Sequence, residues 1–400
     1  MTARAASPLI VGAGVAGLAA GIALAQRGVQ PLTLDRAPES SPAGGGLQLG
    51  PNAVKVLWAL GLRDQLCTLA ACPDRIELRQ LGTGLLLGQL HLGPRFEARY
   101  GAPYCTLLRS DLSAMLLQAH ASLGLEVQWE RTVQSVAQSH QSVLVETPNE
   151  VRYEASAVIG ADGLWSACRP AVSAADQPKA AEQIAVRAVL PAPTAEAAFS
   201  TKVQVHSAPG RHLVSYPVQA GRAIALVAIV PSREALSPGW GAPLARDRLM
   251  EALGPMPLRL SAMVEAAGPW LAWPLWASAP LSSARAQADG RVALIGDAAH
   301  PMRPHLAQGA AMGLEDALVL ANCWARVGNS SPVQAFADFA NLRWRRNART
   351  QSRAIRVGRV FQLDGLLAWA RNLALGLLSE TLMDQPGLYA YDAREIGQAD

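Results

Sequence analysis

Charged residues are scarce in this chain of 400 residues, and their distribution argues against a nucleic-acid-binding protein. Only 16% of the residues are Asp, Glu, Lys or Arg, and the formal net charge is +4. The basic residues are scattered. Their longest cluster, Arg343–Arg346, lies in a helix-like stretch and is expected to form a solvated face. Because binding to a phosphate backbone requires a dense basic patch, we expect no nucleic-acid partner.

Cysteine is also scarce, and long hydrophobic runs are missing. The five cysteines form no CxxC pair and no Cys/His spacing typical of a metal site. An odd number of scattered cysteines is typical of buried thiols in a reducing compartment, so we predict a cytoplasmic protein without a metal. No apolar stretch of about eighteen residues, the length that a membrane-spanning helix needs, is free of glycine. We therefore expect no stable membrane insertion.

Apolar residues, in contrast, make up 50% of the chain, enough for a large core. The first 24 residues contain an early Arg4 followed by an apolar run, a pattern shared with secretory signals. The spacing of the glycines in this segment favours a different role.

The N-terminal segment carries a strand–glycine–helix pattern. The β-type run Leu9–Val11 leads into the sequence GAGVAG, whose glycines are Gly12, Gly14 and Gly17, and a second extended run ends on Asp35. This is a GxGxxG motif between a strand and a helix, with an acidic residue about twenty positions later. Such glycines allow a tight turn, a close approach of the backbone to a pyrophosphate, and close packing of the helix on the strand. The motif predicts a dinucleotide site but does not distinguish FAD from NAD(P).

A second candidate cofactor motif lies near residue 300. The sequence RVALIGDAAHP (291–301) predicts a strand that ends at Gly296 and Asp297, followed by a loop and by a helix from about Ala310. A carboxylate at the end of a strand suits a polyol hydroxyl. Gly309 would let backbone N–H groups approach a ring at the positive end of that helix.

Together these motifs resemble the three fingerprints of the class A flavoprotein monooxygenases, which have the para-hydroxybenzoate hydroxylase fold. The fingerprints are GxGxxG with Asp35, GADG (160–163) with Ser166 and Arg169, and GDAAHP (296–301). The stretches LAQGA (306–310), EDA (315–317) and RNLA (371–374) are more similar to the salicylate and 3-hydroxybenzoate 6-hydroxylase branch. The resemblance implies an FAD-dependent monooxygenase that hydroxylates a small phenol or hydroxybenzoate through a C4a-hydroperoxyflavin, with O2 as co-substrate. There is no second GxGxxG unit, so NADH or NADPH would bind only transiently.

The same resemblance implies a set of FAD contacts. Asp35, where most relatives have Glu, would bind the adenosine ribose, Arg109 would reach the ribityl–pyrophosphate region, and Asp297 would bind the ribityl chain. Asp162 would serve the FAD phosphate region and the approach of the nicotinamide. Gly45, with the two residues after it, matches a loop that contacts a mobile flavin. The implied cofactor-binding residues are Gly12, Gly14, Ala16, Gly17, Asp35, Arg36, Gly46, Leu47, Arg109, Val133, Asp162, Gly163, Asp297, Pro301, Gly309 and Ala310.

The expected fold class is α/β: a Rossmann-like FAD-binding domain, a β-rich substrate lobe and a C-terminal helical segment. Short β-type runs separated by Pro and Gly place four strands of the lobe at 183–190, 202–206, 212–218 and 222–230. Ser110 is expected to cap a helix of the FAD-binding domain. The expected division assigns 1–72, 101–170 and 271–330 to the FAD-binding domain, 73–100 and 171–270 to the substrate lobe, and 331–400 to the helical segment.

Two residues are candidates for catalysis on the substrate side. His305, in the loop expected to meet the flavin, could bind or deprotonate a phenol, or it could simply bond to backbone. Tyr216, on a strand of the lobe, could orient a hydroxyl, although a packed core tyrosine is the favoured interpretation. Arg187 or Arg303 could pair with a substrate carboxylate, although an ion pair at the surface or in the FAD domain is favoured. Trp270, Trp273 and Trp276 could line an aromatic pocket or belong to the core, and the core is favoured. His206 and His212 receive no role, and His300 is expected to be structural.

Several functions remain open at this point. The same fold could hydroxylate or epoxidise a quinone precursor or a heteroaromatic ring, and FAD motifs also occur in non-oxygenating oxidoreductases or flavin-binding sensors. The apolar stretch 366–378 could associate with a membrane surface, but packing on the lobes or in a homodimer interface is favoured.

Overall fold

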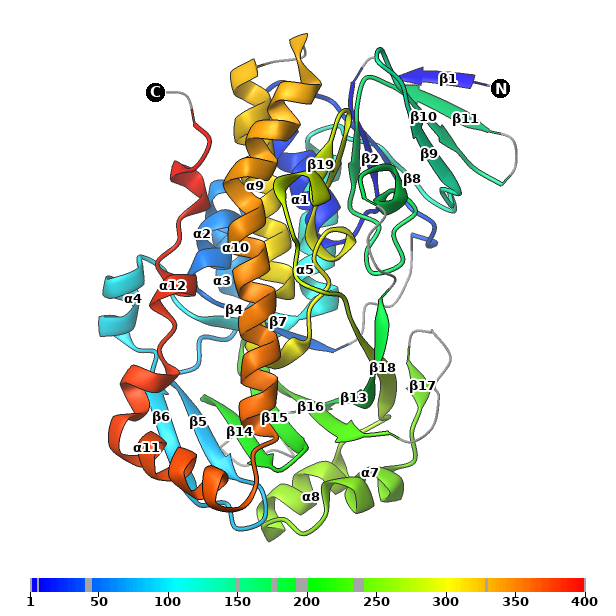
Figure 1. Cartoon of the computed structure of the whole chain (residues 1–400). Coiled ribbons are helices and arrows are strands. Elements are labelled where there is room, and N and C mark those ends of the chain that lie inside the picture. Colours follow the sequence, from blue (N-terminus) through cyan, green and yellow to red (C-terminus); the bar gives the residue numbers. More distant parts are fainter. Residues whose placement is uncertain are drawn as a thin grey trace.

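The structure, a computed structural model, describes the strand at residues 2–5 and residues 7–39, 45–148, 151–173, 178–191, 201–232, 241–327 and 330–398. A parallel sheet with its helices occupies one half of the molecule and a large, mostly antiparallel sheet the other. The long helix α10 (Pro332–Phe361) runs beside both (Figure 1). Among the described residues, no helix is long and apolar enough to cross a membrane.

The parallel sheet brings the sequence motifs together. It has six strands in the order β19-β20-β12-β2-β3-β8, and every neighbouring pair is parallel except β19·β20. In register, Val11 lies opposite Leu34 and Gly160, and Gly160 lies opposite Leu294. The carboxyl ends of the strands therefore meet at one edge, where an open α/β sheet binds ligands. The strands are β2 (Leu9–Val11), β3 (Leu32–Leu34), β8 (Val127–Gln128), β12 (Val158–Gly160), β19 (Ala288–Asp289) and β20 (Val292–Leu294).

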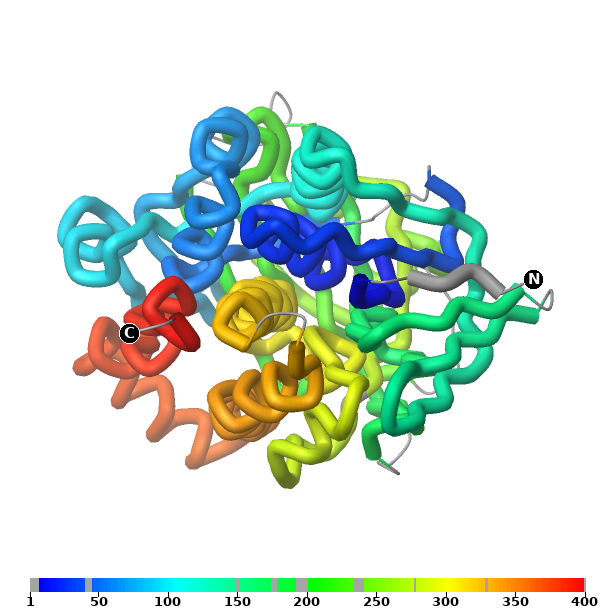
Figure 2. The backbone as a smooth tube through the Cα atoms, turned by 90° about the horizontal axis from the view of Figure 1, so that it is seen from above, coloured from blue at the N-terminus to red at the C-terminus, as the bar shows by residue number. Residues whose placement is uncertain are grey.

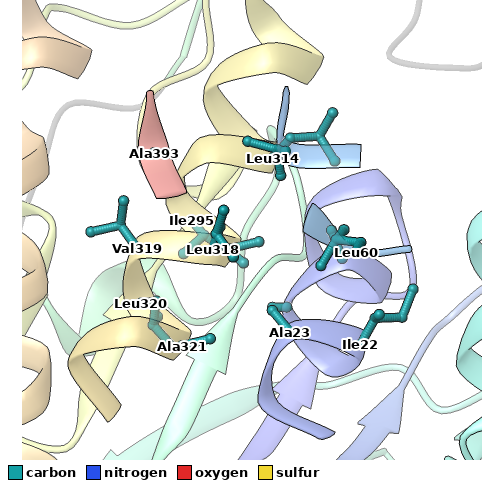
Figure 3. Packing of buried hydrophobic residues seen from close by; sticks show 14 of the residues in the cluster. Ile22, Ala23, Leu60, Ile295, Leu314, Leu318, Val319, Leu320, Ala321 and Ala393 are labelled. Carbon is teal, nitrogen blue, oxygen red and sulfur yellow. The ribbon is translucent and has the colours of Figure 1, made fainter. Parts of the chain in front are cut away.

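Helix α9 (Gly309–Val327) is the centre of this half. Viewed from above, it lies between α1 (Val15–Ala25) and α10 (Figure 2). The sequence predicted one apolar face, but α9 is buried on nearly all sides because helices cover it on both flanks. Its leucines pack against Ile22 and Ala23 of α1 and against Leu60, beyond α2 (Pro51–Ala59) (Figure 3). Further helices here are α3 (Arg63–Leu69) and α5 (Arg109–Ser122), and a small sheet is formed by β1 (Thr2–Ala5), β11 (Arg152–Ala155), β10 (Val143–Glu146) and β9 (Ser135–Gln138).

The second half is an eight-stranded sheet in the order β17-β18-β13-β16-β15-β14-β5-β6. The four predicted strands of the lobe are confirmed, as β13, β14, β15 and β16. Successive side chains alternate between the two faces. One face packs on α7 (Arg246–Leu253) and α8 (Leu258–Ala266), and the other is turned to the FAD-binding half. The strands are β5 (Arg75–Gln80), β6 (Leu86–His91), β13 (Lys179–Pro191), β14 (Lys202–Ala208), β15 (Arg211–Val218), β16 (Ala223–Pro231), β17 (Ala242–Pro243) and β18 (Leu271–Ala277).

A short two-stranded sheet joins the halves. Strand β4 (Gly46–Leu49) pairs antiparallel with β7 (Cys105–Leu108), and β7 continues directly into α5. Between β6 and β7 lies α4 (Pro94–Tyr100). After α10, helix α11 (Gly365–Met383) packs on β6 but leaves much of its apolar surface exposed, and α12 (Pro386–Tyr389) follows.

Three sequence expectations are wrong. Arg343 is completely buried and ion-paired, as described below, so Arg343–Arg346 is not a solvated face. Helix α5 begins at Arg109, so Leu108 and not Ser110 is its N-cap. The thiols are not all buried, because two of the five, Cys67 and Cys72, are exposed. Each error concerns a contact with a distant segment or a helix boundary, which a local pattern does not fix.

The three tryptophans near residue 270 differ in their surroundings. Trp270 is a core residue at 3% exposure, as favoured. Trp273 and Trp276 are only partly buried. Trp276 meets the edge of the Trp165 ring, and Trp273 stacks under the Arg187 guanidinium.

Candidate active site

The turn after β2 has the shape of a pyrophosphate cradle. Gly12 has a φ of +107°, and a Cβ there would lie 2.4 Å from the Ala161 carbonyl oxygen. A Cβ at Gly17 would collide with the Gly12 carbonyl oxygen, at 1.8 Å. Around Gly14, in contrast, nothing lies within 4 Å of an added Cβ, so this side of the turn is open. Helix α1 starts there without a side-chain cap, which leaves its first N–H groups free for an anion.

Asp35 closes the same turn from the end of β3. Its carboxylate accepts hydrogen bonds from the backbone N–H groups of Ala13 at 2.5 Å and Ala37 at 2.7 Å. The carboxylate is therefore held at the mouth of the glycine turn, in reach of a ligand on the open side. Arg36, next to it, is exposed, and Val133 packs on the cluster that contains Leu34.

The second motif stands beside the first. Gly296, with a φ of +58°, turns the chain after β20 and leaves the Asp297 side chain exposed. A Cβ at Gly309, the first residue of α9, would lie 4.0 Å from Asp297 Oδ1, so this carboxylate faces the start of α9. Arg169 fixes the loop by donating to the carbonyl oxygens of Ala298 at 2.8 Å and Asp297 at 3.1 Å.

Three other predicted contacts have local roles as well. Ala16 packs on Gly296 and Gly313. A Cβ added at Gly296 would lie 3.1 Å from the Ala16 Cβ, and one added at Gly313 would lie 3.0 Å from it. The carbonyl oxygen of Pro301 accepts from Gln351 at 3.2 Å. Leu47 packs on the core of the FAD-binding half. Gly163, with a φ of +76°, and Ala310, at the start of α9, line the same edge of the sheet.

Asp162, after β12, has one oxygen occupied and one free. Its Oδ2 accepts from the N–H groups of Ala167 at 2.7 Å and Cys168 at 3.2 Å. Its Oδ1 is buried and has no hydrogen-bond partner among the described residues. An unpaired buried oxygen is costly, so a donor from a bound ligand would stabilise it.

A buried ionic network supports the second motif from below. Asp316 Oδ2 binds His300 Nε2 at 2.5 Å and accepts from the Gly296 N–H at 3.1 Å, while its Oδ1 accepts from Arg343 Nε at 2.8 Å. Burial raises the pKa of Asp316, but the His300 and Arg343 charges outweigh it, so the pKa lies below the usual value. Glu315 pairs with Arg343 and Arg346, each at 2.7 Å. His300 is thus a structural residue, as expected, and the network fixes the Gly296 turn to α9 and α10.

The loop before β4 meets the eight-stranded sheet. The carbonyl oxygen of Gly45 accepts from the Arg109 N–H at 2.9 Å. A Cβ at Gly45 would lie 2.7 Å from Arg187 Cδ, and one at Gly46 would lie 2.8 Å from the Tyr216 hydroxyl. Because they lack a Cβ, these glycines let the loop before β4 pack directly on Arg187 and Tyr216.

The sheet face turned to this loop carries polar groups around an apolar centre. His212, Val214 and Tyr216 alternate on β15 and share one face. Val214 is paired with Val227 of β16, and Val227 with Arg187 of β13, in one row across the sheet. Val214, Val227 and Arg187 are only partly buried, whereas His212 and Tyr216 are buried.

Arg187 is a partly buried cation with no anion beside it in the part of the chain that the structure describes. Its Nε is buried and has no hydrogen-bond partner, and no described carboxylate forms an ion pair with it. Its Cζ lies 5.0 Å from the centre of the Trp273 ring, a cation–π contact. Burial lowers the pKa of the guanidinium, opposed by Tyr216. Arg187 is therefore not in the ion pair that the sequence favoured. The Nε of Arg303 is likewise buried and unpaired among the described residues.

His305 belongs to the same region. The short 3-10 turn Pro304–Leu306 brings its ring to 5.7 Å from the ring centre of His212, and Phe361 stacks on His212 at 5.3 Å. A Cβ at Gly358 of α10 would lie 2.9 Å from the His305 ring, so α10 holds the imidazole in place. Desolvation lowers the pKa of His305 to about 4 and that of His212 to about 3, so both rings are neutral at pH 7. His305 Nδ1 is buried without a partner among the described residues, which argues against a simple bond to backbone through that nitrogen.

Sequence reasoning did not place His212 beside His305, and the ion pair that it favoured for Arg187 is not found among the described residues. The alternation on β15 was a usable signal for His212, since it places residues four positions apart on the face of Tyr216. No local signal identifies Arg187 as unpaired, because that depends on which segments approach it in the fold.

The site fits a flavin dinucleotide. The open glycine cradle, the uncapped helix α1, the unpaired Asp162 oxygen and the exposed Asp297 at the start of α9 lie along one sheet edge. They offer donors to a pyrophosphate and acceptors to sugar hydroxyls. Gly46 lies against Tyr216 and Ala225, so the loop before β4 meets the polar face of the eight-stranded sheet.

Comparisons with known proteins agree with this geometry. The model of the FAD binding domain family matches residues 6–343. The chain is 31% identical over 376 residues to 3-hydroxybenzoate 6-hydroxylase 1 of Aquipseudomonas alcaligenes, covering 93% of this chain and 94% of the relative. It is 36% identical over 359 residues to 3-amino-4-hydroxybenzoate 2-monooxygenase of Streptomyces cremeus, covering 89% and 88%. Among solved structures, Klebsiella pneumoniae HpxO complexed with FAD and uric acid superposes with a TM-score of 0.81 at 22% identity, over 94% of this chain and 93% of the other.

Proposed function

We propose a substrate class for this chain, which belongs to the FAD binding domain family and is an FAD-dependent aromatic monooxygenase. Its substrate is a hydroxylated aromatic carboxylate, and the carboxylate of that substrate pairs with Arg187. The two relatives described above act, by their names, on benzoates. NADH or NADPH is the electron donor typical of the family, and we infer O2 as the second co-substrate.

The observation that carries this proposal is the unpaired charge of Arg187. A buried guanidinium without a carboxylate is unstable relative to a paired one, and its planar N–H groups match a carboxylate in two parallel hydrogen bonds. Arg187 also lies beside Gly45 and Tyr216, where the loop before β4 meets the eight-stranded sheet. An anionic ring substrate would supply the missing partner at the place where hydroxylation must occur.

The other residues of this face suit a phenolic ring. Val214 and Val227 form an apolar floor beside Arg187, which excludes water from the ring. The imidazoles of His305 and His212 are neutral at pH 7, so each has a ring nitrogen that can accept a hydrogen bond from a phenol hydroxyl. Burial raises the pKa of Tyr216, so its hydroxyl stays protonated and donates a hydrogen bond. When bound, FAD supplies the redox chemistry, and these residues orient and activate the ring.

We further infer that FAD is held by the predicted contact residues along the edge of the parallel sheet. The glycines of the first turn would admit the pyrophosphate, Asp35 would bind the ribose, and Asp297 would bind the ribityl chain. The expected division into FAD-binding parts (1–72, 101–170 and 271–330), substrate lobe and helical segment remains our proposal for the domains.

The test compares acids with their neutral amides. Oxygen uptake by FAD-loaded protein with NADH or NADPH is measured for hydroxybenzoates and hydroxynicotinates and for the matching carboxamides, with catalase to reveal peroxide. We expect at least one acid to stimulate uptake without peroxide release, and its amide to be a much poorer substrate. Stimulation by neutral rings alone would contradict the carboxylate and favour a quinone precursor or a neutral heteroaromatic. A rate that no ring compound raises, across a panel that includes quinone precursors, would contradict monooxygenation.

Arg187→Met tests the anchor itself. Loss of one partner of a buried charged pair costs about 2–5 kcal/mol, so KM for the acid should rise about 30-fold or more. KM for the amide should change little, and Arg187→Lys should lie between. Equal losses for acid and amide would mean that Arg187 serves the cofactor or the fold instead.

A further inference from the structure

Two cysteines that are distant in the sequence lie in direct contact. Cys72 follows α3, and Cys105 is the first residue of β7. Their Sγ atoms are 3.6 Å apart, although 33 positions separate them in the chain. Cys105 is buried, with 3% exposure, whereas Cys72 is exposed.

The backbone holds this pair in a geometry that suits a disulfide. Ala71 and Thr106 form an antiparallel bridge, with hydrogen bonds of 2.8 Å in both directions. Cys72 and Cys105 are the next pair along this bridge, so they are direct cross-strand neighbours in a non-hydrogen-bonded position. Cα atoms in such positions lie about 4.5 Å apart, within the range of about 4.4–6.8 Å that disulfides require.

We propose that Cys72 and Cys105 form a reversible thiol–disulfide site that a hydroperoxide oxidises. The Cys72 thiolate attacks the terminal peroxide oxygen, which breaks the O–O bond, gives a sulfenic acid on Cys72 and releases the other oxygen as the alcohol, or as water when the oxidant is hydrogen peroxide. The Cys105 sulfur then attacks the Cys72 sulfur, forms the S–S bond and displaces the oxygen as water, with loss of the Cys105 proton. The peroxide takes up the two electrons, and a dithiol reductant reverses the modification.

The surroundings divide the two roles between the sulfurs. The exposed Cys72 is the sulfur that an oxidant reaches, and the buried Cys105 is protected until Cys72 has reacted. The hydrogen bond from Cys105 lowers the pKa of Cys72 to about 7, and the same contact together with burial raises the pKa of Cys105. Low thiol pKa, exposure and an adjacent resolving cysteine are the features of redox-sensitive thiols.

The position of the site gives the disulfide a structural consequence. The chain between the two cysteines contains β5, β6 and α4, and β5 and β6 belong to the eight-stranded sheet. A disulfide would therefore join the two ends of this segment where it leaves the FAD-binding half. Thr106 also donates to the carbonyl oxygen of Pro217, next to Tyr216, at 2.5 Å. Oxidation would link the segment after α3 covalently to β7, which is already hydrogen-bonded to the strand that carries Tyr216, and it should raise the midpoint of thermal unfolding.

The experiment treats the reduced, FAD-loaded full chain with about one equivalent of hydrogen peroxide and maps its peptides by mass spectrometry without reduction. We expect a Cys72–Cys105 peptide that is about 2 Da lighter than the sum of the two thiols, loss of two of the five free thiols, and recovery of both with dithiothreitol. The unfolding midpoint should rise on oxidation and return on reduction.

Two variants serve as test and control. Cys72→Ser should abolish the cross-linked peptide and the shift in the midpoint. Cys67→Ser, which removes the other exposed thiol, should leave both unchanged. A disulfide between Cys67 and Cys72, a link between two chains, or a sulfinic acid on Cys72 with Cys105 still reduced would overturn the proposal.

Discussion

Replacing Arg343 by methionine should destabilise the protein strongly, because the guanidinium is the buried counter-charge of two carboxylates. Arg343, Glu315 and Asp316 all have completely buried side chains. Arg343 Nη1 lies 2.7 Å from Glu315 Oε2, an ion pair whose N–H is not aligned as a hydrogen bond, and Nε donates to Asp316 at 2.8 Å. The carboxylates raise the pKa of Arg343 above its usual value despite its burial, so the cation is permanently present.

The expected loss follows from what the substitution leaves behind. Removing one partner of a buried pair costs about 3–5 kcal/mol, since the other charge stays buried. With an unfolding entropy of about 2.1 cal/mol/K per residue over the chain, this lowers the melting temperature by about 4–6 °C. The Gly296 turn, which Asp316 anchors, should loosen as well, so FAD should dissociate more readily.

The assay is denaturant and thermal unfolding of the apoprotein, followed by tryptophan fluorescence, together with FAD retention on gel filtration. Arg343→Met/Asp316→Asn is the matched control, because it neutralises one of the two buried carboxylates that lose their Arg343 partner and should recover part of the stability lost in Arg343→Met. A loss below about 1 kcal/mol in the single variant, or no recovery in the double variant, would refute the assignment of this network as a stabilising ion cluster.

Three further outcomes are expected. Asp297→Ala should weaken FAD retention, measured by flavin fluorescence after dialysis, because this carboxylate faces the start of α9; retention equal to wild type would contradict its assignment to the ribityl chain. His305→Ala should lower the ratio of product to NAD(P)H consumed, and unchanged coupling would return His305 to a structural role. Desolvation lowers the pKa of His120 to about 4, and burial with the Arg79 charge does the same for His206. Because the unfolded histidines titrate near 6.5, stability is complete above that pH and should fall by about 1.4 kcal/mol per pH unit per histidine between pH 6.5 and 4; a denaturant midpoint that is flat over this window would contradict buried neutral rings.

The cofactor half of the site was accessible from the sequence because its signals are local. The turn containing Gly12, Gly14 and Gly17 requires glycine for steric reasons within a few residues, and the strand before it and the helix after it follow from short apolar runs. The parallel sheet then brings the Asp297 motif to the same edge, as its position at the end of a strand predicted. The class of the substrate lobe was likewise readable, since four β-rich runs became four strands.

The substrate half depended on pairings that a single segment does not encode. The residue type of Arg187 alone favoured an ion pair, whereas the fold places it on Trp273 with no carboxylate of the described residues as a partner. His212 lies near His305 because β15 packs against the loop before α9 and against the end of α10, and no local sequence pattern encodes that packing.

Sequence by itself thus determined the flavin motifs, the α/β class and the family resemblance, because steric rules for glycine and the alternation of apolar residues act over neighbouring positions. Tertiary structure alone decided that Arg343 is buried, that Arg187 meets no counter-ion among the described residues and that Cys72 touches Cys105. The physical reason is the same in each instance: the free energy of a charge or a thiol is set by burial and by the groups within a few ångströms, and those groups come from segments far away in the chain.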